Sequence, residues 1–212
     1  MFWWATLVSS LGSLIQSVGA AWLMTTIAPS ADRVALVQTA GALPFFFFSL
    51  IAGAYADTHD RRFIMLASQF VMLAAAITLA SLAWFGQVTP ELLLGLTFLI
   101  GCGTAAFAPA WQASIGEQVP RDLIPSAIMA NAVGFNMARS VGPAIGGVIV
   151  AAAGVALAFI INAVSYLGTL AALFWWRPVR AKNPLPPEPL GAAIAAGARY
   201  VRLSPHLMAI LA

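Results

Sequence analysis

The apolar residues of this chain form long continuous runs that are separated by short polar segments. The runs are roughly 20 residues or longer and lack the strict alternation of half-buried strands, so each can cross a bilayer as an α-helix. A backbone in lipid must satisfy its own hydrogen bonds, which favours helices here over the strands of a barrel. The predicted crossings are 2–27, 34–56, 63–85, 90–114, 125–152 and 156–176.

Local patterns predict where some of these helices begin and turn. The run 125–176 is far too long for one crossing, and Ala152-Ala153-Gly154 is its natural break. Thr89-Pro90-Glu91 combines a hydroxyl cap, a proline in the first turn and an acid at the helix N-terminus, which predicts a helix start. The polar segment 116–124 is expected to be a loop.

The same pattern predicts the domain organisation. Residues 1–176 are expected to form one six-span bundle. Residues 177–204 begin with prolines and charges and end in a mildly amphipathic stretch, so we expect a cytoplasmic linker with a short helix. Residues 205–212 resemble the start of a seventh span, so the chain looks cut rather than finished.

Composition supports an all-α polytopic membrane protein. The chain of 212 residues is 61% hydrophobic and 8% charged, whereas soluble domains carry about 25% charged residues. The net charge of +3 does not indicate nucleic-acid binding, because the basic residues are scattered at the ends of the predicted helices. Cys102 is the only cysteine, and His59 and His206 have no companion at metal-ligand spacing, so the sequence predicts no disulfide, metal site, cofactor or enzyme active site.

Charge also predicts the orientation of the helices. If the N-terminus is cytoplasmic, the loops and linker on that side hold eight of the ten Lys and Arg residues, and the opposite side holds only Arg33. This asymmetry is typical of cytoplasmic loops. All seven tryptophans lie near a predicted span end, as expected for residues at the two membrane interfaces.

The tenth basic residue, Arg139, falls near the middle of the predicted span 125–152. A cation at that depth costs about 3 kcal/mol or more, so its side chain must meet protein, water or a ligand. At ~100° per residue, the polar and small residues of this span share an arc about 140° wide, which we expect to line an interior. These residues are Asn131, Asn136, Arg139, Gly142, Pro143 and Gly146.

Two roles stay open for Arg139. It could be a structural cation bonded to carbonyls and asparagines, or it could contact an anionic or hydrogen-bonding substrate together with Asn136 and Asn131. No carboxylate lies deep in any predicted span, so an ionic partner of Arg139 must be a ligand or lie outside these spans.

A second polar face lies on the first predicted span, where Ser9, Ser13, Gln16, Ser17 and Ala20 recur at helical spacing. This face could pack closely against another helix or could line a polar cavity. The depth of Gln16 in the span favours the cavity, which makes Gln16 a candidate substrate contact.

Two motifs resemble those of the major facilitator superfamily. Gly53, Asp57, Arg61 and Arg62 resemble the loop motif between the second and third spans of that family, with departures at Thr58 and Asp60. The stretch 139–147 resembles the span-five motif of its exporter branches. Segments 108–114, 119–122 and 136–139 are similar to a bacterial subgroup that includes the enterobactin exporter.

The resemblance implies the first half of a protein with about twelve spans, whose two six-helix halves open a central site alternately to each side. It implies that the loop motif, with Arg121, forms a cytoplasmic gate against the missing C-terminal half. It also implies that Gly142, Pro143, Gly146 and Gly147 form a pliable seam between moving parts, although plain helix packing would also explain them.

The expected function is secondary active transport at the bacterial inner membrane. We expect export of a small organic molecule, such as a drug-like amphiphile or a siderophore, driven by protons. Two alternatives stay open, namely an importer of a small metabolite and a six-span membrane scaffold or sensor that transports nothing.

Overall fold

The computed structural model describes residues 2–176 together with Arg199 and Leu203. The described chain is entirely helical, as the sequence predicts. Its elements are α1 (Phe2–Ile27), α2 (Ala31–Thr58), α3 (Arg61–Trp84), α4 (Pro90–Gln118), the short 3-10 helix η1 (Arg121–Leu123) and α5 (Ile124–Trp175). The predicted linker and the start of a seventh span lie outside the described residues, apart from Arg199 and Leu203.

The long element α5 consists of two helical segments that are joined at Gly154. This residue has φ 81° and ψ 171°, a conformation that a glycine adopts far more readily than other residues. The first segment of α5 runs parallel to α1, because Gly134 faces Trp3 and Gly146 faces Val18. The second segment runs antiparallel to α1, because Ala158 faces Gly19 and Thr169 bonds Ala5. The chain therefore reverses direction at Gly154, and the predicted break is confirmed.

Capping side chains explain several helix boundaries. Ser30 accepts a hydrogen bond from the Arg33 amide, so α2 begins three residues before the predicted span. Asp60 accepts one from the Arg62 amide and starts α3. Thr89 accepts one from the Leu92 amide, which confirms the predicted start of α4.

The predicted loop 116–124 is wrong over most of its length. Helix α4 continues through Gln118, and η1 follows after Pro120. Proline disfavours the helical conformation of the residue before it, and Val119 is accordingly extended, with φ −132° and ψ 153°. The polar residues of this segment therefore end a helix instead of forming an open loop.

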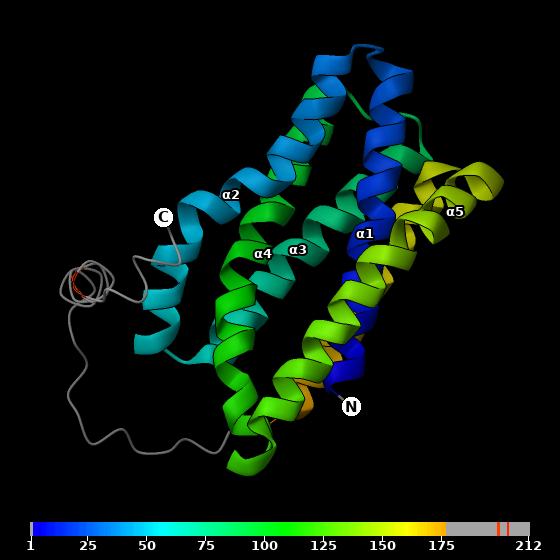
Figure 1. The fold of residues 1–212 in the computed structure, drawn as a ribbon. Coiled ribbons are helices and arrows are strands. Elements are labelled where there is room, and N and C mark those ends of the chain that lie inside the picture. The colour runs from blue at the N-terminus through cyan, green and yellow to red at the C-terminus, as the bar shows by residue number, and fades with distance from the viewer. Residues whose placement is uncertain (1, 177–198, 200–202, 204–212) are drawn as a thin grey trace.

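Consecutive helical segments run in opposite directions, and in the bundle α1 packs on both segments of α5, α2 packs on α4, and α3 lies against α4 and α5. Figure 1 shows the α1–α2 and α3–α4 connections and the reversal of α5 at one end of the bundle. Figure 1 also shows the α2–α3 and α4–α5 connections at the other end. Small residues permit this packing, because a Cβ added at Gly101 of α4 would lie 2.6 Å from the carbonyl oxygen of Gly41 in α2.

Among the described residues, four helical stretches are long and apolar enough to cross a membrane, namely Phe2–Ile27, Arg61–Trp84, Pro90–Gln118 and Arg121–Trp175. The last of these spans 55 residues and contains the reversal at Gly154. Helix α2 is not among the four, although it has 28 residues and lies alongside α4.

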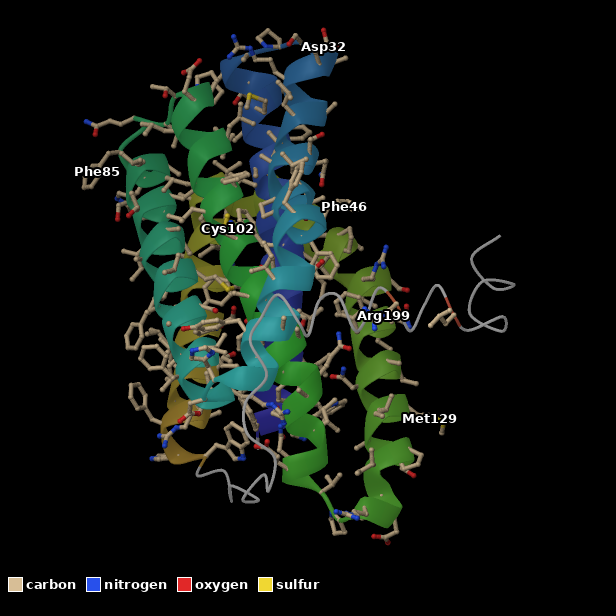
Figure 2. All side chains as sticks on the ribbon, turned by 90° about the vertical axis from the view of Figure 1, so that its left-hand side faces the viewer. Asp32, Phe46, Phe85, Cys102, Met129 and Arg199 are labelled. Carbon is tan, nitrogen blue, oxygen red and sulfur yellow. The ribbon has the colours of Figure 1, made fainter. Side chains whose placement is uncertain are left out.

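Large apolar side chains are exposed on α2 and on the first segment of α5, residues 124–153. Phe46 is 80% exposed and Met129 is 66% exposed, and both point away from the bundle in Figure 2. Exposed apolar surface of this extent is expected for helices that face lipid or another membrane-embedded surface.

Candidate functional site

A stripe of small residues attaches the first segment of α5 to α1. Gly134, Ala138, Gly142 and Gly146 recur every four residues and are buried. A Cβ added at Gly142 would lie 2.9 Å from Cβ of Leu14, and one added at Gly146 would lie 3.1 Å from Cα of Ile15. The two backbones therefore approach more closely than larger side chains would allow.

This stripe corrects the predicted arc of polar and small residues. Gly142 and Gly146 do not share a surface with Arg139, because they are buried against α1 whereas Arg139, Asn136 and Pro143 are exposed. Gly147 also faces open space, since a Cβ added there would meet no atom within 4 Å. The one predicted arc is thus divided into a packed stripe and an open face.

Arg139 lies on that open face. Its guanidinium carbon is 5.8 Å from the ring centroid of Phe135, one helical turn earlier, which is within the range of a cation–π contact. Among the described residues, Arg139 has no carboxylate within ion-pair distance. The cation is therefore available to a partner that approaches from outside the described bundle.

The two predicted asparagines differ in exposure. Asn136 is exposed, and its side-chain amide donates to the carbonyl oxygen of Ala132 at 2.9 Å. Asn131 is half-buried, two helical turns before Arg139. Asn136 keeps its amide oxygen free to accept a hydrogen bond from a bound molecule.

Gln16 lies elsewhere, in a buried polar cluster between α1 and the second segment of α5, residues 155–175. Its side chain is 4% exposed, and its amide oxygen accepts a hydrogen bond from Asn162 Nδ2 at 2.6 Å. Ser13 Oγ lies 3.1 Å from the Tyr166 hydroxyl, and Ser165 donates to the Asn162 carbonyl at 2.7 Å. The polar face of α1 is used here for helix packing, and the structure does not bring Gln16 together with Arg139.

Sequence reasoning missed the partners in this cluster. Asn162, Ser165, Tyr166 and Thr169 recur at helical spacing in the second segment of α5 and are all at most 6% exposed. Their spacing matches that of the polar residues on the first predicted span, which was the available signal that two polar faces meet.

We expect the Gln16–Asn162 pair to contribute about 0.6–1.7 kcal/mol to the stability of the bundle, as interhelical polar pairs do when double-mutant cycles measure them in membrane proteins. A double-mutant cycle with Gln16→Leu and Asn162→Leu, read by unfolding in detergent, measures this coupling. Ser140→Ala is the control, because that hydroxyl bonds only the Asn136 carbonyl of its own helix. A coupling near zero would show that the pair adds nothing to helix association.

Arg61 of the loop motif connects three helices of this bundle. Its guanidinium donates to Glu117 Oε1 at 2.7 Å and to the Ala113 carbonyl at 3.1 Å, both in α4, and to the Ala56 carbonyl in α2 at 3.4 Å. The ends of α2, α3 and α4 are thereby held together on the side that the charge pattern predicts to be cytoplasmic.

Arg62 binds the end of a fourth helix. It donates to the Leu173 and Phe174 carbonyls at 3.0 and 2.9 Å, which are among the last carbonyls of α5 and would otherwise lack helical partners. A Cβ added at Gly53 would meet no atom within 4 Å, so that side of α2 is open. Asp57 belongs to α2, but its side chain lies outside the described part, and Arg121 is exposed in η1.

Among the described residues, there is no group of three or more His, Cys, Asp or Glu side chains that could hold a metal ion.

Comparison with known proteins identifies the family. Residues 1–212 match the major facilitator family described as transmembrane secretion effector. The chain is 28% identical to the multidrug efflux pump Tap of Mycobacterium tuberculosis over 211 positions, which cover 93% of this chain and 49% of that protein. It thus spans about half the length of this relative.

Two further relatives are named as transporters or efflux proteins. The staphyloferrin A transporter of Staphylococcus aureus is 27% identical over 157 residues, with 74% of this chain and 40% of that protein covered. Macrolide efflux protein A of Streptococcus pyogenes is 27% identical over 120 residues, with 57% and 30% covered. The chain therefore belongs to the transmembrane secretion effector family of the major facilitator transporters, a family of multi-pass membrane proteins and not of enzymes.

Proposed function

We propose that this chain is the N-terminal half of a bacterial inner-membrane exporter that moves a small organic molecule outward. The observation that carries the proposal is Arg139, a cation in the middle of a candidate span with no acidic partner among the described residues. A membrane protein that keeps such a costly group on an open face needs a partner for it there. An anionic or hydrogen-bonding substrate is that partner in our proposal.

The relatives support the substrate class. One is named a multidrug efflux pump, one a macrolide efflux protein and one a staphyloferrin A transporter, so amphiphilic drugs and siderophores are the first compounds to test. In our proposal Arg139, Asn136 and Asn131 contact the substrate, whereas Gln16 acts only through the packing of α1. We infer six crossings, with α2 as one of them and α5 supplying two.

The positions of the acidic residues bear on where a coupling proton would bind. Among the described residues, the acids occupy helix ends and polar connections, and none lies deep in a candidate span. We propose that protons drive export and that the group which carries them is contributed by the second half. In this proposal the substrate contacts Arg139 in the first half, and protons bind to a group in the second half.

The function is tested with inverted membrane vesicles that contain the intact protein. Uptake of a fluorescent amphiphile or a siderophore into these vesicles, abolished by a protonophore, supports proton-driven export. Flux in the opposite direction would show an importer. Absence of any flux across a broad compound screen would favour a membrane scaffold or sensor.

We expect Asp57→Asn to slow transport about tenfold while leaving substrate affinity within about twofold, because loss of a charge–dipole contact of ~1.4 kcal/mol at a gate changes the rate of opening. Separate measurements of flux and of equilibrium substrate binding distinguish the two effects. Asp32→Asn, at the opposite end of α2, is the control. An equal loss of binding and of flux would show that the loop does not act as a gate.

A further inference from the structure

A groove on the outer surface of the bundle runs between α1 and the second segment of α5. Its volume is about 600 Å³. Its lining includes Trp4, Val8 and Ile15 from α1 and Val164 and Gly168 from α5. The groove is open at Gly168, which has no side chain and no atom within 4 Å of an added Cβ.

The groove opens away from the centre of the bundle. On the opposite side of α1, Phe2 packs its ring 4.7 Å from Trp111 of α4, and Met24 lies in a core cluster with Leu79 and Leu93. At ~100° per residue, Trp4, Val8, Leu11 and Ile15 of the groove lie about 120–180° around the helix from Phe2 and Met24. Trp4, Val8 and Val164 on the rim are 64%, 52% and 59% exposed.

The lining is apolar. Of the groove's eleven residues, only Ser165 carries a hydroxyl, acid or amide side chain. That hydroxyl already donates to the Asn162 carbonyl at 2.7 Å, so it offers no free donor to a polar ligand. No charged side chain of the described residues lines the groove, so these residues offer no partner to a charged headgroup within it.

The groove is also elongated along the helix axis. Its α1 residues extend from Trp4 to Ile15, and with a rise of ~1.5 Å per residue this corresponds to about 16 Å. The charge pattern predicts that the Trp4 end is cytoplasmic, so the groove covers the inner half of the span. Tryptophan at that end lies where membrane-interface aromatics are found.

We propose that this groove holds one acyl chain of an inner-leaflet phospholipid, with the headgroup at the level of Trp4. An extended hydrocarbon chain fits a long, uncharged slot that opens into the bilayer. Because lipid is as apolar as the groove, the hydrophobic effect does not hold the acyl chain there. The chain is held by van der Waals contacts, which are more numerous in a fitted slot than on a convex helix surface.

The test uses the intact protein in vesicles of phosphatidylethanolamine and phosphatidylglycerol that contain a phospholipid with a photoreactive acyl chain. After illumination, peptide mapping locates the labels. We expect labels to concentrate on residues 4–15 and 160–168 relative to Val148, which is 69% exposed but outside the groove. Equal labelling of Val148 and Val164 would overturn the proposal.

A groove-filling variant supplies the second comparison. A Cβ added at Gly168 meets no atom within 4 Å, so the side chain of Gly168→Leu can extend into the slot. We expect labelling of the groove to fall about fivefold, which corresponds to ~1 kcal/mol. Gly95→Leu on α4, where the space is equally open, should leave labelling unchanged.

Val164→Trp fills the groove from its rim and should lower the labelling in the same way. Agreement of the two variants shows that the fall does not come from a folding defect specific to Gly168→Leu. Unchanged labelling in both variants would overturn the proposal. Protein–protein cross-links at the groove that disappear in Gly168→Leu would also overturn it, since they would identify a second copy of the chain as the occupant.

Discussion

Replacing Arg139 with alanine is expected to reduce transport by the intact protein strongly while leaving its insertion into the membrane unchanged. Hydrogen bonds to a charged group contribute about 1.5–3 kcal/mol, so flux should fall by roughly tenfold to a hundredfold. Insertion should not suffer, because removing a cation from the middle of a span lowers the cost of placing that span in lipid. Flux into inverted vesicles, normalised to the amount of protein in the membrane, measures the effect.

Two variants separate a substrate contact from a structural cation. Arg139→Lys keeps the charge but loses the planar guanidinium, so it should retain part of the flux of an anionic substrate. Arg121→Ala removes an exposed arginine of η1 and is expected to leave substrate affinity unchanged. Near-normal flux in Arg139→Ala would remove Arg139 from the substrate site. Loss of folding in that variant would identify it as structural.

The fold could be predicted largely from two limits that lipid imposes, namely the length of a crossing and the need of the backbone to satisfy its own hydrogen bonds. The length of a crossing required a break in the run 125–176, and glycine marked where that break lies, since Gly154 has a positive φ. Helix ends were harder to predict, because a cap depends on geometry as well as residue type. Asp60 looked like a departure from a family motif, and in the structure it caps the α3 N-terminus.

The candidate site was less predictable, because a helical wheel shows which residues share a face and not what that face meets. The polar face of α1 could have lined a cavity, but Asn162 from a segment 146 residues away satisfies Gln16. Gly142 and Arg139 fall near each other on the wheel, yet one is buried against α1 and the other is exposed. The position of the partner helix decides between these outcomes, and the periodicity of one helix taken alone does not give that position.

The contact between α1 and the first segment of α5 is expected to fail when Gly146 is replaced by leucine. A Cβ at Gly146 would lie 3.1 Å from Ile15 Cα, 3.2 Å from Val18 Cβ and 3.4 Å from the Ile15 carbonyl oxygen. Two of these three atoms are backbone, so a rotamer change cannot relieve the clash and the helices must separate. Overpacking of this kind costs about 1–3 kcal/mol, which we expect as a loss of stability in detergent unfolding.

The adjacent glycine provides the matched control for this prediction. Gly147→Leu changes the same residue type one position later, where no atom lies within 4 Å of the added Cβ, so its stability in detergent should stay close to that of the unmodified protein. A difference between the two variants assigns the effect to helix contact and not to the helix propensity of leucine, which is the same at both positions. Equal stability of both variants would mean that the stripe is not closely packed on α1. Equal loss in both would place a further helix against the open face that carries Gly147, as the second half of the transporter would provide.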